Sequence, residues 1–62
     1  MNQEYWRERE VRQATKLSRS TRWRLEHQGL FPRRRQLSAN AVGWLKSEVL
    51  AWIAARSPVV SK

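Results

Sequence analysis

The sequence contains no cysteine and no aspartate. Without cysteine, neither a disulfide nor a thiolate metal site can stabilise the fold. The five acidic residues are all glutamate, and their spacing does not suggest an acid/base pair in a pocket. His27, the single histidine, has no cysteine or aspartate nearby, which makes it a poor candidate for a metal ligand. We therefore expect no enzyme activity, no catalytic residues, no metal and no cofactor.

Long apolar segments are also missing. The longest strictly apolar run, residues 49–55, is far shorter than the about 20 residues that a membrane-spanning helix requires. Met1–Gln3 is not a basic segment leading into an apolar stretch, as a secretory signal would be. These features predict an intracellular protein without a membrane partner.

Positive charge is what the chain has in excess. Thirteen lysines and arginines face five glutamates, which gives a net charge of +8 and a pI near 11.6. Ten of the thirteen are arginine, the residue best suited to bidentate contacts with phosphate and guanine. This balance favours a polyanionic partner and, because no segment pairs a basic face with a wide apolar face, nucleic acid before membrane phosphates.

A chain of 62 residues has room for one domain, and a domain of this size buries only about 60% of the surface of its unfolded chain. Four tryptophans, with Tyr5 and Phe31, supply the bulk for a compact core. We expect residues 1–62 to form a single domain, with the core at about residues 5–56 and a tail at 57–62.

Apolar periodicity, capping residues and prolines divide the chain into short elements. They predict a helix at Glu8–Thr15, a brief turn, a second helix from the N-cap Ser18 to about Gln28, a hairpin, and a third helix. In the hairpin, Arg33–Leu37 and Val42–Leu45 form the strands around a turn at Ser38–Ala41; Ser47 caps the third helix, and Ser57-Pro58 ends it.

This order predicts a mainly α fold with a small β-hairpin, the winged helix-turn-helix. The expected buried residues are Val11, Thr15, Leu17, Leu25, Trp44 and Trp52, with Leu30 and Phe31 closing the core; Tyr5 and Trp6 could pack on the domain or contact a neighbour. In such a fold the second helix offers its polar face to the major groove. The candidate recognition residues there are Ser18, Arg19, Ser20, Thr21, Arg22, Trp23, Arg24 and His27.

An ordered series of short motifs resembles the AlpA-type family of phage and prophage regulators. It comprises Glu10-Val11, Thr15–Thr21 and Arg24-Leu25, and continues through Gly29, Phe31-Pro32, Leu37, Val42–Trp44, Ser47–Val49 and Ala51–Ile53. The resemblance covers about residues 5–56. It implies a winged helix-turn-helix related to MerR regulators and phage excisionases, acting in the cytoplasm of a bacterial host and on its nucleoid. It also implies two roles, transcriptional regulation and control of recombination direction, which the sequence does not separate.

Three positions depart from the family pattern. Lys16 replaces the turn glycine, so a left-handed lysine would be strained. Arg22 replaces an aliphatic residue that is usually buried, so either its stem packs or the helix rotates and Trp23 joins the core. Trp23 is thus a candidate for either the core or the groove. Ser38 and Asn40 replace the glycine and arginine of the wing tip, so the tip is less basic and Arg33, Arg34 and Arg35 carry the phosphate contacts. The candidate DNA-binding residues of the wing are Arg33, Arg34, Arg35, Ser38 and Asn40.

The predicted partner is double-stranded DNA, with the second helix in the major groove and the wing on the backbone. Further copies of the chain on adjacent sites, an integrase and RNA polymerase are additional candidate partners. Two alternatives stay open. An RNA or single-strand binder would need Trp6 and Trp23 on one open surface. A protein-interaction module, such as an antirepressor or polymerase-associated factor, would offer its basic face to an acidic partner.

Overall fold

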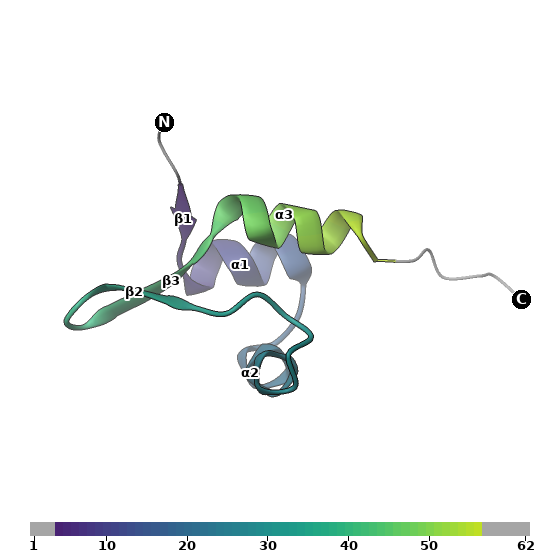
Figure 1. The fold of residues 1–62 in the computed structure, drawn as a ribbon, viewed down its shortest axis with the longest axis horizontal. Coiled ribbons are helices and arrows are strands. Elements are labelled where there is room, and N and C mark those ends of the chain that lie inside the picture. Colours follow the sequence, from purple (N-terminus) through teal and green to yellow (C-terminus); the bar gives the residue numbers. More distant parts are fainter. Residues whose placement is uncertain (1–3, 57–62) are drawn as a thin grey trace, which may run out of the picture.

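Three helices and a small antiparallel sheet make up residues 4–56, the part of the chain that the computed structural model describes (Figure 1). The elements follow one another as β1 (Tyr5–Trp6), α1 (Glu8–Thr15), α2 (Arg19–His27), β2 (Arg35–Ser38), β3 (Ala41–Leu45) and α3 (Lys46–Ala54). The expected helices and hairpin are therefore confirmed. The tail expected at 57–62, with the Ser57-Pro58 stop, lies outside the described residues.

The strand β1 was not predicted, because two residues are too short to show a pattern. It pairs with β3 through Tyr5↔Leu45 and Trp6↔Trp44, so β3 is the central strand between β1 and β2. Gly43 allows this close packing: a Cβ there would lie 2.8 Å from Leu37 Cδ1 and 3.0 Å from the Trp6 carbonyl oxygen. Tyr5 and Trp6 therefore pack on the domain as an edge strand of the sheet.

Several predicted boundaries are wrong. The turn is shorter than the expected Ser38–Ala41, because β2 extends to Ser38 and β3 begins at Ala41. The first hairpin strand begins at Arg35 rather than Arg33, because β2 pairs with β3 only from Arg35↔Gly43 onward. Helix α3 begins at Lys46 with Leu45, not Ser47, as its N-cap. Leu45 is buried at the end of β3, and the Lys46 N–H donates to the Glu4 carbonyl (2.8 Å), so the strand passes into the helix without a loop.

The connection from α1 to α2 forms as predicted. Lys16 lies in the left-handed region (φ 62°), and its N–H donates to the Arg12 carbonyl at 2.8 Å. Ser18 is the N-cap of α2, since its hydroxyl accepts from the Thr21 N–H at 3.3 Å. Gly29, at φ 76°, ends the helix as expected. The second helix is therefore held at both ends by local geometry.

The core lies where α1, α3 and β3 meet. Val11, Phe31, Trp44 and Val49 form the buried cluster, and Trp6, Leu25, Trp52 and Ile53 pack against it. Of the predicted core residues, Leu30 is wrong: its side chain is 55% exposed, while its carbonyl accepts from Trp52 Nε1 at 2.7 Å. Phe31 alone closes the core at this end.

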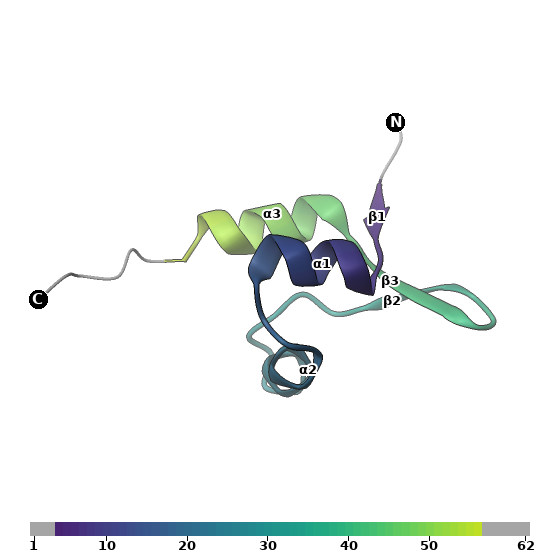
Figure 2. The ribbon, with the colours of Figure 1, turned by 180° about the vertical axis from the view of Figure 1, so that it is seen from behind.

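The ribbon views show how this core presents α2. In both, α2 lies on one side of α1 and α3 with its axis nearly along the line of sight (Figures 1 and 2). The β2–β3 hairpin projects in the direction opposite to the C-terminal end of α3. One face of α2 is thus available at the surface, with the hairpin extending from the same body.

Candidate nucleic-acid interface

Helix α2 has two contrasting faces. Arg22 and Glu26 are buried and Leu25 is half-buried, so this side of the helix rests on the domain. Five residues of the helix are exposed, and the helical period places them together on the opposite side. This exposed face of α2 consists of Arg19, Ser20, Trp23, Arg24 and His27.

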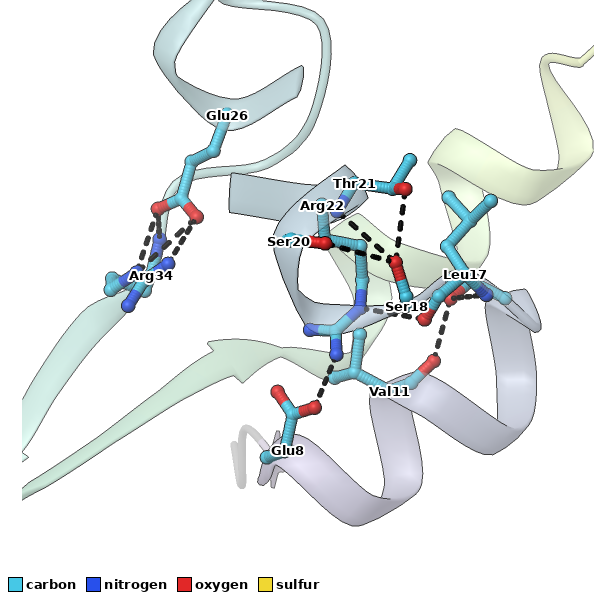
Figure 3. A network of polar contacts seen from close by, with 10 residues as sticks. Glu8, Val11, Leu17, Ser18, Ser20, Thr21, Arg22, Glu26 and Arg34 are labelled. Carbon is cyan, nitrogen blue, oxygen red and sulfur yellow. Dashed lines mark hydrogen bonds and ion pairs between the residues drawn. The ribbon is translucent and has the colours of Figure 1, made fainter. Parts of the chain in front are cut away.

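Arg22 is not available for DNA contact, which corrects its prediction as a recognition residue. It is 1% exposed, and its guanidinium makes a short ion pair with Glu8 of α1 (Figure 3). Its Nε also donates to the Leu17 carbonyl at 3.3 Å, and its Cζ lies 5.5 Å from the centre of the Trp44 ring. The stem packs and the charged head finds an internal partner, so the helix does not rotate to bury Trp23.

Trp23 is accordingly exposed, at 52%, on the outer side of α2. Its ring stacks at a tilt on His27, with centroids 3.9 Å apart. His27 Nδ1 lies 2.9 Å from the Trp23 carbonyl and donates to it, because a carbonyl oxygen can only accept. The stacking and this hydrogen bond therefore fix the two rings as one aromatic pair on the exposed face of α2.

The small polar residues at the start of α2 divide in the same way. Ser18 caps the helix and donates to Thr21 Oγ1 at 3.0 Å, while Thr21 is half-buried. Ser20 is exposed, with its Oγ 3.4 Å from that of Ser18 (Figure 3). Ser18 and Thr21 thus serve the helix start, and Ser20 faces outward.

A second buried ion pair ties α2 to the hairpin. The Glu26 carboxylate, 6% exposed, accepts from the Arg34 backbone N–H at 2.7 Å and from its Nη2 at 3.0 Å (Figure 3). Burial opposes ionisation of Glu26, but the hydrogen bonds from Arg34 outweigh it and hold the pKa of this carboxyl below its ordinary value. The Arg34 guanidinium also lies against Trp44, with Cζ 5.5 Å from the ring centre.

This pair changes the expected role of the wing arginines. Arg34 is committed to Glu26, and Arg35 pairs with Glu48 of α3 at 2.8 Å. Arg33 is exposed and has no ion pair within residues 4–56. Ser38 and Asn40 are exposed at the end of the hairpin, where Gln36 Nε2 donates to the Ser38 carbonyl at 3.0 Å. Of the three arginines, only Arg33 is left without a carboxylate partner.

Two arginines that the sequence did not single out join the same region. Arg7 and Arg9, at the start of α1, line a pocket of about 330 Å³ together with Arg19 of α2 and Asn40 of the hairpin. In the sequence, Arg7 and Arg9 belong to a cluster of charged residues around Trp6. Nothing in that cluster indicates that the start of α1 lies beside α2. The pocket lies next to the exposed face of α2.

In the part of the chain that the structure covers, no group of three His, Cys, Asp or Glu residues could hold a metal ion. None of the helices between residues 4 and 56 is long and apolar enough to cross a membrane.

Comparison with known proteins places the chain among prophage regulators. Residues 4–57 match the family model of the prophage CP4-57 regulatory protein AlpA. The uncharacterized protein ORF88 of Enterobacteria phage P4 is 47% identical over 47 residues, which are 76% of this chain and 53% of that protein. The chain thus spans about half the length of this curated relative. The match over the whole described fold shows that the chain belongs to the AlpA family of prophage regulatory proteins.

Proposed function

We propose that this protein is a sequence-specific double-stranded DNA-binding regulator, built as a winged helix-turn-helix. Helix α2 enters the major groove, and the β2–β3 hairpin is the wing that lies on the backbone. The protein acts in the bacterial cytoplasm as a transcriptional regulator, as an excisionase that controls recombination direction, or as both.

The exposed face of α2 carries this proposal. Arg19 and Arg24 have no ion-pair partner within residues 4–56, and they flank Ser20 and the Trp23–His27 pair. Arginine is suited to hydrogen bonds with the edge of guanine, and serine can hydrogen-bond to more than one kind of base. An apolar ring can contact the methyl group of thymine. The net charge of +8 supports a partner rich in phosphate.

A salt titration tests the proposal. A duplex that the protein enriches from a random-sequence pool serves as the specific target, with a scrambled duplex as control. If about five phosphates are neutralised, the logarithm of the affinity should fall with the logarithm of salt concentration with a slope of about −4 to −5. The specific duplex should stay the tighter ligand at every salt concentration. A slope near zero, or equal affinity for the two duplexes, contradicts the proposal.

One observation favours a second candidate, a binder of single strands or RNA. Trp23 is exposed and could stack on an unpaired base. Trp6, however, is half-buried in β1, where the Lys46 ammonium lies 5.6 Å from its ring centre. Such binding would need both tryptophans on one open surface, and of the two only Trp23 is exposed. Competition of the enriched duplex by its separate strands and by RNA of the same sequence distinguishes the candidates.

The regulatory role is tested by footprinting on the DNA that flanks the gene. Repeated protected sites in an attachment region support recombination control, and protection of a promoter supports transcriptional regulation. Because one 62-residue chain contacts few base pairs, we expect several copies on adjacent sites. Strictly independent occupancy of a multi-site fragment would contradict this last point. Integrase and RNA polymerase are the protein partners that these two roles would require.

A further inference from the structure

The pocket at the start of α1 has an unusual wall. Five arginines and one glutamate line it, contributed by α1, α2 and the hairpin region. Two of the arginines, Arg22 and Arg34, are neutralised by Glu8 and Glu26. The other three, Arg7, Arg9 and Arg19, are exposed and have no ion pair among residues 4–56.

Like charges gathered around one cavity repel each other, and an anion placed among them removes that cost. Two helices also begin at this pocket, since Glu8 is the first residue of α1 and Arg19 the first of α2. Helix N-termini carry partial positive charge, which adds to the attraction for an anion. The charge and the helix ends therefore favour the same kind of ligand.

Trp44 gives an independent sign of a missing partner. It is 3% exposed and lines the pocket, yet within the described fold its Nε1–H meets no hydrogen-bond acceptor. A buried donor without an acceptor costs free energy unless a bound group supplies one. An anion in the pocket would supply that acceptor after a small shift of the ring that opens Nε1, which the described fold keeps closed to solvent.

The position of the pocket identifies the anion. It is bordered by the start of α2 on one side and by Asn40 and Val42 of the hairpin on the other. If α2 lies in the major groove and the hairpin lies beside it on the duplex, one DNA strand must run between the two elements. In that arrangement the phosphates of the strand would pass over the pocket that Arg7 and Arg9 line.

We infer that this pocket holds one backbone phosphate of the bound duplex, with Arg7, Arg9 and Arg19 as its contacts. The inference rests on the proposed function and extends it to α1, which becomes a clamp on the strand between the two grooves. The contact is to a phosphodiester and carries no base information, so it sets the register of α2 on the DNA rather than its sequence preference.

The test combines one protein substitution with one phosphate substitution. Neutral methylphosphonates are placed one at a time along both strands of the enriched duplex, and affinities are measured for the wild type and for Arg9→Gln. We expect one position, between the segments protected by α2 and by the hairpin, to weaken wild-type binding about tenfold. The Arg9→Gln variant should already be weaker, with a salt slope smaller by about 1, and should lose clearly less affinity at that position than the wild type, because Arg7 and Arg19 remain as contacts.

Arg12→Gln is the matched control. Arg12 is exposed on the same helix but does not line the pocket, so this variant should keep the methylphosphonate effect. Because Arg9 is exposed, Arg9→Gln should fold normally, which circular dichroism checks. If Arg9→Gln shows the same methylphosphonate profile as the wild type, the pocket does not hold a phosphate, although duplex binding stands. If the wild type binds no duplex, the proposed function itself fails.

Discussion

The two faces of α2 use the same kind of residue for opposite purposes. On the inner face, Arg22 is buried and paired with Glu8, and one turn later Glu26 is buried and paired with Arg34. On the outer face, Arg19 and Arg24 are exposed and have no carboxylate partner in residues 4–56. Residue type therefore does not separate the buried, paired arginines of this helix from the exposed arginines that we propose as DNA contacts. Burial and pairing separate the two groups.

The inner face also shows how a small domain uses charge in place of apolar bulk. The guanidinium groups of Arg22 and Arg34 both lie over the Trp44 ring, each with its Cζ 5.5 Å from the ring centre. These contacts connect α2 and the segment before β2 with β3, and the Arg22–Glu8 pair adds α1. Since removal of one partner of a buried pair costs far more than the pair itself contributes, the inner face should tolerate truncation poorly.

The largest effect should follow from Arg22→Ala. The change removes a buried stem and leaves a cavity beside Trp44, which we expect to cost about 3 kcal/mol, whereas the partly exposed Glu8 carboxylate can be solvated. A single core of this size supplies only about 3–5 kcal/mol, so the variant should retain at most about 2 kcal/mol. Urea denaturation measures the loss. Arg24→Ala, on the outer face, should stay within about 0.5 kcal/mol of the wild type. Equal losses for the two variants would contradict the distinction between the faces.

Arg24→Ala should instead change DNA recognition. A base-contacting arginine discriminates by about 1–3 kcal/mol, so the ratio of specific to scrambled binding should fall by about that amount. Arg33→Ala should weaken both duplexes equally and reduce the salt slope by about 1. Arg33 is chosen because Arg34 is held by Glu26. Binding curves on both duplexes at two salt concentrations provide the measurement. If Arg33→Ala collapses the ratio and Arg24→Ala does not, the hairpin carries the specificity.

Acid should weaken the inner face through Glu26. Its pKa is lower in the folded chain than in the unfolded chain, because the hydrogen bonds from Arg34 outweigh the opposing effect of burial. Such a group stabilises the fold above the unfolded pKa of about 4.3, and this stabilisation is lost as the pH falls through the lower folded value. Urea midpoints between pH 6 and pH 3 should therefore decrease. Glu26→Gln should reduce this dependence, and an unchanged dependence in that variant would assign it to other groups.

The smallest effect concerns Lys16, in the connection between α1 and α2. Lys16 is left-handed at φ 62°, where a Cβ is strained and glycine is not. Lys16→Gly should stabilise the domain by about 0.5–1 kcal/mol in urea melts, while DNA specificity stays the same. Destabilisation would mean that the position is right-handed in solution.

Local signals predicted the local parts of this fold. The N-cap Ser18, the stop at Gly29 and the strained Lys16 each depend on residues within one helical turn, and the structure has all three. The resemblance to the AlpA family added the positions where Lys16 and Arg22 are unusual. The start of α2, its end and the connection before it were therefore predictable from the sequence.

The sequence did not predict the contacts that join distant residues. Glu8 and Arg22 are fourteen residues apart, and nothing in the sequence selects Glu8 as the partner rather than Glu4 or Glu10. In the sequence, Arg34 cannot be distinguished from its neighbour Arg33. Only the fold shows that Glu26 lies beside Arg34. The pocket arginines Arg7 and Arg9 were missed for the same reason, because their neighbour Arg19 belongs to another helix.

The most direct test of the account is a map of the bound surface. Backbone amide and tryptophan indole NMR signals are followed while the enriched duplex is added to the wild-type protein. We predict the largest shifts in the exposed face of α2, including the Trp23 indole, with further shifts at residues 38–42 of the hairpin. That face consists of Arg19, Ser20, Trp23, Arg24 and His27. The signals of α3, Lys46–Ala54, should change little. Shifts concentrated on α3, or no response to duplex beside a strong response to single strands, would contradict the claim that the outer face of α2 reads double-stranded DNA.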